Sequence, residues 1–240
     1  MKGKQIVLDH LGEREAMAVL VDGQLDDLIV DTDAPRIGTI YRAIADRPLK
    51  GLGGVFVKTP DGPAFLRQAK GISPGQRLLV QVSGYAEPGK AFPVTTRLLC
   101  KSRFASVTPD APGLNISRSV KDSETRAALS ALAEDVMQDA PFGRILRTSA
   151  RDADEDDIHA DIDAMKTLAQ QVLADSSHDI EKLLEGDGPH TLAWRDGASD
   201  VSWHEGPKSF VETGVLDAVE ALKSPYVALS GGAGMYIAPT

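Results

Sequence analysis

Residues 53–67 read GGVFVKTPDGPAFLR, which is two short runs of β-branched and aromatic residues around a turn sequence. Pro60-Asp61-Gly62-Pro63 is typical of a turn between strands. Similar runs occur on both sides of this pair, and together they predict five strands near residues 38–46, 53–58, 64–67, 76–83 and 92–99. Five short strands with glycine and proline at the corners suit a small closed β-barrel.

The barrel segment is basic, whereas the rest of the chain is acidic. The 240 residues carry a formal net charge of −9, yet residues 36–103 hold twelve Lys and Arg against three Asp and Glu. Residues 1–35 carry −5 and residues 104–240 carry −13. A compact cationic block in an acidic chain predicts a surface for a polyanion, and chance clustering on a solvated face is the alternative.

Two aromatic residues, Phe56 and Phe65, fall on adjacent strands of the predicted barrel. If both rings face outward, they form a platform for the bases of single-stranded nucleic acid, and an OB barrel is the barrel that most often carries such a face. If both face inward, they fill the barrel interior. Spacing alone slightly favours the interior.

The segments that flank the barrel add strands and helices, so the predicted class is α+β. Before the barrel we expect strands at 5–8, 16–21 and 25–30, with Asp22-Gly23 as a hairpin turn. After it we expect strands at 104–107 and 143–148 and a hairpin of 226–229 with 235–237. Helices are expected at 122–137, from Pro189 and at 210–222, with another of about twenty residues whose apolar stripe runs from Ile158 to Leu173 and whose first turn holds the acids after Arg151. Residues 180–184 suit either a strand or a helix.

Composition excludes several classes of protein. The longest apolar runs are only a few residues, so no membrane-spanning helix is expected, and the N-terminal residues do not read as a secretory signal. The single cysteine, Cys100, excludes a disulfide framework and an all-cysteine zinc site. The five histidines show no metal-ligand spacing. We therefore predict no catalytic residue and no metal site in the chain, and a cytoplasmic location.

Short motifs then occur along the chain in a fixed order: Gly38–Ala43, Gly54–Val57 with Phe65-Leu66, Gly75–Val82, Lys90 with Val94–Thr96, Ile116–Arg118, Leu146–Thr148 and Leu229–Gly232. In this order they resemble the ribonuclease E/G family over essentially the whole chain. The resemblance implies a five-stranded OB barrel and a small α/β sensor subdomain inserted into a split RNase-H-like subdomain. The implied ranges are 1–35 and 176–225 for the split subdomain, 36–103 for the barrel, 104–175 for the 5′ sensor, and 226–240 for the start of a truncated catalytic subdomain.

The resemblance also implies site residues by matching position. Phe56, Phe65 and Lys90 would contact single-stranded RNA, and we add Arg42 of the first motif to this set. Arg147 and Thr148 would hold an RNA 5′-monophosphate, for which guanidinium and hydroxyl donors are suited. The alternative for Arg147 is an exposed strand residue paired with the acids after Asp152. Ser119 stands where the family often has a second arginine, which predicts a weaker sensor.

Members of the family cut RNA with magnesium held by two carboxylates just beyond the Gly-Gly hairpin, and the sequence stops at Thr240 before that segment. We therefore expect the chain alone to bind single-stranded RNA for processing or decay without cutting it, to need no cofactor and to contact no membrane; a homo-oligomer stays open. One alternative is a complete, non-catalytic regulator or assembly partner whose acidic half, 104–240, docks a basic partner. Another is hydrolase activity from a site that the sequence does not reveal.

Overall fold

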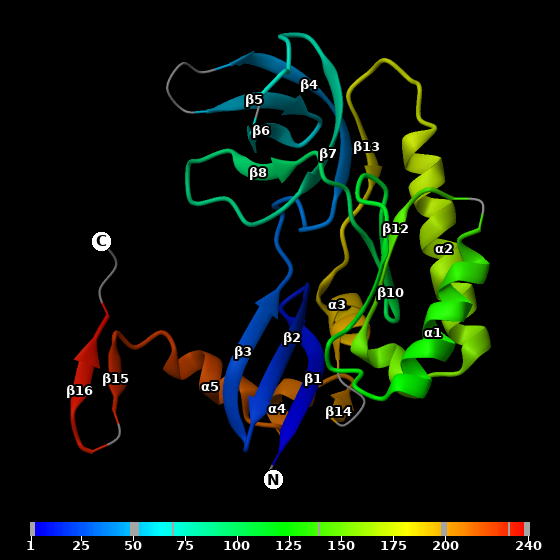
Figure 1. The fold of residues 1–240 in the computed structure, drawn as a ribbon. Helices are drawn as coiled ribbons and strands as arrows, with labels where there is room; N and C mark the ends of the chain where they lie inside the picture. The colour runs from blue at the N-terminus through cyan, green and yellow to red at the C-terminus, as the bar shows by residue number, and fades with distance from the viewer. Residues whose placement is uncertain are drawn as a thin grey trace. The chain divides into compact units, whose positions relative to one another are not determined.

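The computed structural model describes residues 3–48, 53–68, 70–138, 140–197, 201–229 and 231–237. The chain divides into two compact units. The first consists of Met1–Asp31, Gly188–Ala193 and Gly197–Thr240, and the second of Thr32–Asp187 with Trp194–Asp196. Strands and helices both contribute to each unit (Figure 1), which confirms the predicted α+β class. The four predicted domain ranges stay predictions.

The first unit is built on a four-stranded sheet with the order β14-β1-β2-β3. Its strands are β1 (Lys4–Leu11), β2 (Arg14–Val21), β3 (Gln24–Val30) and β14 (Ser202–Glu205). The last of these lies parallel to β1, so the sheet joins two distant parts of the chain. Asp22 and Gly23 both have positive φ angles, of 52° and 83°. Such angles are those of a tight hairpin turn, and the Asp-Gly prediction is confirmed.

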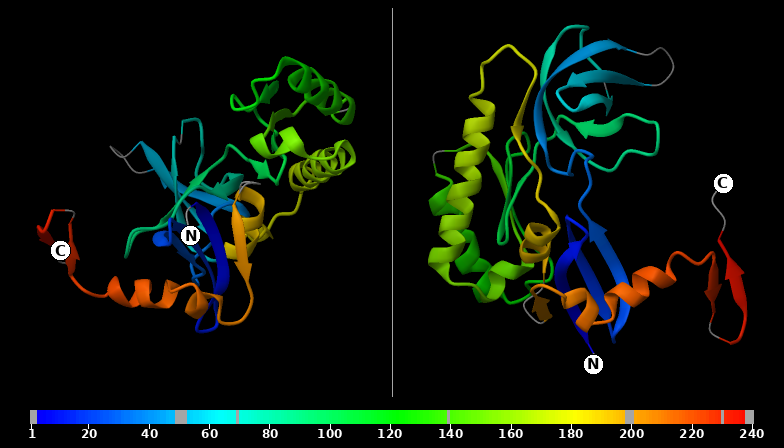
Figure 2. Two further views of the ribbon diagram at one scale, coloured as in Figure 1. Left: turned by 90° about the horizontal axis from the view of Figure 1, so that it is seen from below. Right: turned by 180° about the vertical axis from the view of Figure 1, so that it is seen from behind.

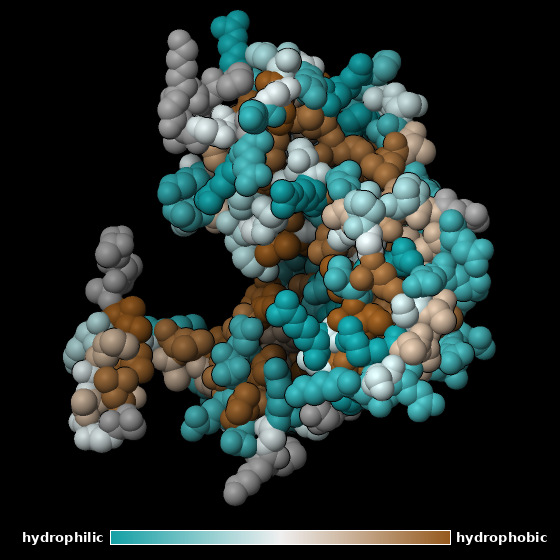
Figure 3. Space-filling view, in the orientation of Figure 1, coloured by the Kyte–Doolittle hydropathy of each residue, from teal (hydrophilic) through white to brown (hydrophobic). Residues whose placement is uncertain are grey.

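The helices of the first unit are shorter than predicted. The expected helix over 210–222 is interrupted, because Gly214 adopts a φ of 75° between α4 (Ser209–Glu212) and α5 (Val215–Ala221). The C-terminal hairpin is confirmed as β15 (Tyr226–Ala228) with β16 (Gly234–Tyr236), although Ser230 of its turn lies outside the described residues. Figure 3 shows apolar side chains gathered on this hairpin, where Tyr236 is 76% exposed.

The second unit contains the barrel. Its five strands are β4 (Ile40–Pro48), β5 (Gly54–Thr59), β6 (Gly62–Arg67), β7 (Arg77–Val82) and β8 (Phe92–Thr95). They pair in the order β4-β5-β6-β8-β7, and β7 pairs with β4 to close the barrel. Valines and alanines of alternate positions, with Tyr41 and Phe92, fill the interior. All five predicted strands are present, but the last one ends at Thr95 and not at residue 99.

A sixth strand, β13 (Glu181–Leu184), pairs antiparallel with the first half of β4. The sequence suited either a strand or a helix at residues 180–184. The structure has a strand there, which begins at Glu181. Figure 2 shows β13 running beside the barrel strand that it joins. Ile40 of β4, Leu98 and Val172 form a small buried cluster that packs the barrel against the end of α2.

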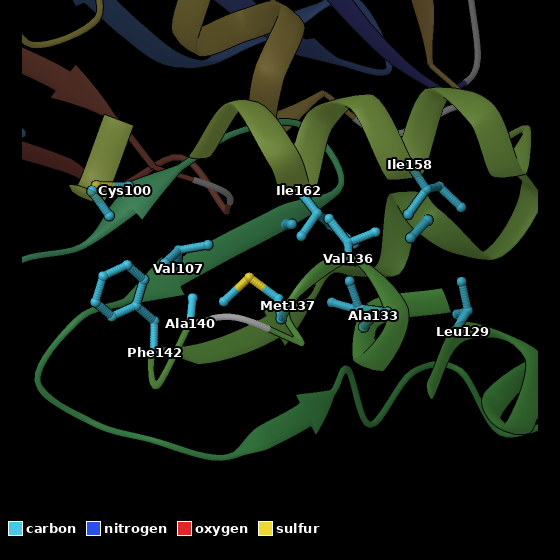
Figure 4. Close-up of a cluster of buried hydrophobic side chains, with 14 of the residues drawn as sticks. Cys100, Val107, Leu129, Ala133, Val136, Met137, Ala140, Phe142, Ile158 and Ile162 are labelled. Carbon is cyan, nitrogen blue, oxygen red and sulfur yellow. The ribbon is translucent and has the colours of Figure 1, made fainter. Parts of the chain in front are cut away.

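The rest of the second unit is an α/β layer. A sheet with the order β11-β12-β10-β9 is covered by α1 (Ser123–Val136) and α2 (Glu155–Leu173). Figure 4 shows the core between them, which includes Met137, Phe142 and Ile162. The four strands are β9 (Cys100–Lys101), β10 (Ala105–Thr108), β11 (Leu114–Ile116) and β12 (Gly143–Leu146). Burial raises the pKa of the Cys100 thiol to about 11, in keeping with a packed side chain.

The helix starts follow local rules. Asp122 caps α1 by accepting a hydrogen bond from the backbone N–H of Thr125 (2.7 Å), as predicted. Asp154 caps α2 in the same way, and the acids of its first turn suit the positive end of the helix dipole. The strand predicted to reach Thr148 ends at Leu146 instead, because the 3-10 helix η1 (Thr148–Asp152) begins two residues later. Among the described residues, no helix is long and apolar enough to cross a membrane.

Candidate nucleic-acid interface

Phe56 and Phe65 both lie on the outer face of the barrel. They are cross-strand partners on β5 and β6, and their ring centroids are 5.4 Å apart at an interplanar angle of 62°. Their strand neighbours Val55, Val57 and Leu66 point into the barrel core. Both rings are half-buried, so the interior arrangement that spacing slightly favoured is wrong. Contact of the rings with RNA stays a prediction.

Gly54 explains how the ring of Phe65 lies so close to the sheet. A Cβ atom at Gly54 would stand 2.4 Å from Cζ of Phe65 and 2.8 Å from the carbonyl oxygen of Leu66. Any larger residue would therefore push the ring away or disturb the β5–β6 pairing. The absence of a side chain at Gly54 leaves room for the Phe65 ring, which packs directly on the backbone there.

Two cations flank the rings. Lys58 and Arg67 stand two residues after Phe56 and Phe65 on the same strands, so they share the outer face. Both are exposed, and neither forms an ion pair with a described residue. Sequence analysis did not single them out, although their i+2 spacing from the phenylalanines was a usable signal. The other barrel cations without a described side-chain partner are Arg47, Lys70 and Arg97.

Lys90 lies in the loop between β7 and β8. Its side chain is 67% exposed and forms an ion pair with Glu87, three residues earlier. The hydrogen bond from Lys90 holds the pKa of Glu87 below its usual range. Because both side chains are exposed, this pair is weak, and the ammonium group remains accessible to an anion.

Arg42 has a different environment from the other cations of the barrel. It is 4% exposed, and its Nε donates to Oδ2 of Asp175 at 2.9 Å. Its Nη2 donates to Glu181 at 2.5 Å and its Nη1 to the carbonyl of Asp179 at 2.9 Å. The guanidinium thus ties β4 to β13 and to the end of α2. We leave Arg42 out of the proposed interface.

Arg147 follows the end of β12, and protein groups occupy most of its guanidinium. Nη1 donates to the carbonyls of Ser102 (2.5 Å) and Arg195 (3.0 Å), and Nη2 pairs with Asp196. The side chain is 20% exposed. It is not paired with the acids after Asp152, which was the alternative from sequence.

Asp196 is the anion of this cluster. Arg195, Lys101 and Arg147 all contact its carboxylate. Burial by itself would raise the pKa of Asp196, but hydrogen bonds and charge from the three cations outweigh it and hold that pKa well below its usual range. A carboxylate therefore already occupies the anion site that the cations form.

Thr148 is exposed and stands next to Ser117, with the two hydroxyl oxygens 2.8 Å apart. The backbone N–H of Ser119 also donates to the Ser117 hydroxyl, at 3.3 Å. Sequence-predicted site residues thus fall into two groups, one on the barrel strands β5 and β6 with the β7–β8 loop, the other at the end of β12. Arg42 belongs to neither group.

A polar pocket of about 370 Å³ lies elsewhere in the second unit. It is lined in part by Asp61, Lys182 and Glu185, and Lys182 pairs with both acids. Acidic lining and paired cations make it a poor site for a polyanion. Over the described ranges, no group of three or more His, Cys, Asp or Glu side chains is placed to hold a metal ion.

Comparison of the sequence with known proteins finds similarity to ribonucleases. The model of the ribonuclease E/G family matches residues 100–200, and ribonuclease E of Synechocystis sp. is 29% identical over 180 residues, which is 68% of this chain. The chain is thus similar to the ribonuclease E/G family, most directly over residues 100–200. Further ribonuclease E/G relatives are ribonuclease E of Nostoc sp., 27% identical over 68% of the chain, and ribonuclease G of Haemophilus influenzae, 26% identical over 72% of it.

The match to these relatives covers only part of their length. It spans 26% of each ribonuclease E and 40% of the ribonuclease G. The family match over 100–200 includes Arg147 and Thr148, whereas the barrel residues Phe56 and Phe65 lie before it.

Proposed function

We propose that this chain binds single-stranded RNA on the β5–β6 face of its barrel and senses a 5′-monophosphate at the end of β12, as part of endonucleolytic RNA processing or decay. The single observation that carries the proposal is the outward pair of Phe56 and Phe65 between two exposed cations. The cytoplasmic location is part of the same proposal.

The strand order of the barrel supports an OB fold. Its strands, counted along the chain as 1 to 5, pair in the order 1-2-3-5-4 and then close on strand 1, with strands 3 and 5 parallel. In OB folds, the face of strands 2 and 3 and the loops after strands 1 and 4 bind oligonucleotides. Phe56 lies on strand 2, Phe65 on strand 3 and Lys90 in the loop after strand 4. Lys50, in the loop after strand 1, lies outside the described residues.

The chemistry of the face fits unpaired RNA. Bases stack on exposed rings in a way that tolerates any sequence, and each stacked base contributes about 1–3 kcal/mol by alanine substitution. Lys58 and Arg67 lie beside the rings, where they can neutralise phosphates of the same strand. A duplex would keep its bases stacked on one another and could not use the rings.

The proposed 5′ sensor would exchange one anion for another. The Thr148 and Ser117 hydroxyls bond to each other, which leaves one of their two protons for a phosphate, but Arg147 is paired with Asp196. We propose that an RNA 5′-phosphate displaces the Asp196 carboxylate from Arg147. Asp196→Asn should then increase the preference for 5′-monophosphorylated over 5′-hydroxyl RNA, since the amide competes less for the guanidinium.

The deciding experiment measures binding of a labelled single-stranded RNA of about ten nucleotides by fluorescence anisotropy. The double variant Phe56→Ala, Phe65→Ala should weaken binding at least tenfold, because two stacking contacts are lost. A matched double variant, Phe56→Leu, Phe65→Leu, keeps an apolar side chain over Gly54 but removes both aromatic rings, and it should weaken binding nearly as much.

Two outcomes contradict the proposal. If the alanine variant binds as tightly as the wild type, the rings do not contact RNA. If the leucine variant restores full affinity, the face is an ordinary apolar surface and stacking plays no part. Circular dichroism and urea midpoints should be compared for all three proteins, so that unfolding is not mistaken for lost binding.

A further inference from the structure

The last residues of α3 (Pro189–Asp196) present an exposed tryptophan beside several cations. Trp194–Asp196 belong to the second unit, where they contact the segment after β9 and the end of β12. The Trp194 side chain is 56% exposed. More than half of the indole is therefore open to a ligand.

Arg103 contacts both Trp194 and its own neighbour in sequence. Its Cζ atom lies 5.0 Å from the centroid of the Trp194 ring and 5.9 Å from that of Phe104. Nη1 donates to the carbonyl oxygen of Trp194. Within the described part of the chain, Nε and Nη2 form no hydrogen bond. The Nη1 group of the guanidinium is therefore bonded to the backbone, and the N–H groups of Nε and Nη2 can donate to a ligand.

The surroundings carry excess positive charge. Four cations gather here near three carboxylates: those of Asp187 and Asp196, which pair with three of the cations, and that of Asp161, which accepts from Ser102 and Phe104. The four are Lys101, Arg103, Arg147 and Arg195. A nucleotide offers a base that can stack on the indole and a phosphate that can bind the unpaired edge of the guanidinium. An apolar peptide lacks the negative charge, and an acidic side chain lacks the ring.

We infer that Trp194 and Arg103 form a second nucleotide-binding position, in which the indole stacks a base of single-stranded RNA and the free edge of Arg103 binds an adjacent phosphate. The inference rests on the proposed RNA binding and extends it to a site away from the β5–β6 face. Arg103 holds one side of the indole in place, so the ring is pre-positioned and loses little freedom when a base stacks on it.

The backbone links this position to the proposed phosphate site. The carbonyl oxygen of Arg103 accepts a hydrogen bond from Nη1 of Arg147 at 3.2 Å and another from the hydroxyl of Ser149. Arg103 thus belongs both to the Trp194 stack and to the surroundings of Arg147. A nucleotide next to the 5′-phosphate is therefore the one that this position would hold.

The two tryptophans of the chain allow a direct test. Trp203 lies on β14 of the first unit and is 40% exposed. In a Trp203→Phe protein the only indole is Trp194, and adding a 5′-monophosphorylated RNA of about ten nucleotides should quench its fluorescence. In the matched Trp194→Phe protein, the same RNA should leave the fluorescence of Trp203 unchanged.

Affinity gives the second readout. Trp194→Ala should weaken binding of the RNA about tenfold by anisotropy, and Trp194→Phe should stay within about threefold, because a smaller ring still stacks. Binding with unquenched Trp194 fluorescence and unchanged affinity in Trp194→Ala would overturn the inference while leaving the barrel interface intact. If the wild type gives no anisotropy change at all, it is the proposed RNA binding that fails.

Discussion

The β5–β6 face and the Arg147 cluster both combine cations with aromatic rings, yet they use their cations in opposite ways. On the barrel face, Lys58 and Arg67 are exposed and have no ion-pair partner among the described residues. At the end of β12, Arg147, Arg195 and Lys101 all contact the Asp196 carboxylate. The first arrangement is ready for a polyanion, whereas the second must first release its own anion.

This difference teaches that a basic segment cannot be equated with a binding surface. Residues 36–103 include Arg42, whose charge braces the fold, and Arg77, whose Nη1 contacts Nδ1 of His178. Only the cations without an internal partner add directly to the attraction for RNA. This contrast predicts that substitutions in the Arg147 cluster lower the stability of the fold, whereas substitutions of the cations on the β5–β6 face weaken RNA binding.

The largest expected effect on stability belongs to Arg147. Arg147→Ala removes hydrogen bonds to Ser102, Arg103 and Arg195 and one ion pair, and it should lower the free energy of unfolding by about 2 kcal/mol. Urea denaturation of the full chain measures this loss. A midpoint equal to that of the wild type would mean that the cluster does not brace the fold.

A smaller effect, which depends on pH, should come from Asp196. Its folded-state pKa is depressed, so its contribution to stability is present above its unfolded pKa of about 4 and is lost as the pH falls below that value. Asp196→Asn should therefore flatten the decline of stability in acid. Thermal unfolding of both proteins between about pH 5 and pH 2 checks this, and identical slopes would contradict it.

The smallest effect on stability, with a clear effect on RNA binding, is expected on the barrel face. Lys58→Gln with Arg67→Gln should change stability by less than about 0.5 kcal/mol, because surface substitutions without partners cost little. The slope of log affinity against log salt should become shallower by about 1.4, since each lost phosphate contact to a single strand removes about 0.7. Lys4→Gln with Lys208→Gln is the matched control in the first unit, since both lysines are exposed and have no ion-pair partner among the described residues. An equal slope in both double variants would show that the barrel cations act only through net charge.

Much of the fold was predictable from local patterns. The alternation of residues 53–67 predicts the β5–β6 hairpin. Asp22-Gly23 predicts the β2–β3 turn, because few other dipeptides favour two positive φ angles. The break at Gly214 was missed because the apolar spacing continues across it. Such a break depends on how the segment packs, and periodicity does not report packing.

The candidate site was predictable only in part. The phenylalanines and Lys90 could be named, but spacing could not give the direction in which the rings point. Gly54 was a usable signal, because a glycine inside a strand often marks a close approach, here that of the Phe65 ring. The pairing of Arg147 with Asp196 joins residues 49 apart in sequence. No local pattern contains that contact.

The strand β13 has a consequence for how the protein folds during synthesis. It pairs with β4 through Glu181 and Arg42, which are 139 residues apart, whereas the last barrel strand ends at Thr95. The barrel can therefore close on the ribosome long before its sixth strand has been translated. Until then water solvates the Arg42 guanidinium. A late docking step, in which β13 and the end of α2 arrive together, is what turns this arginine from a surface charge into an internal brace.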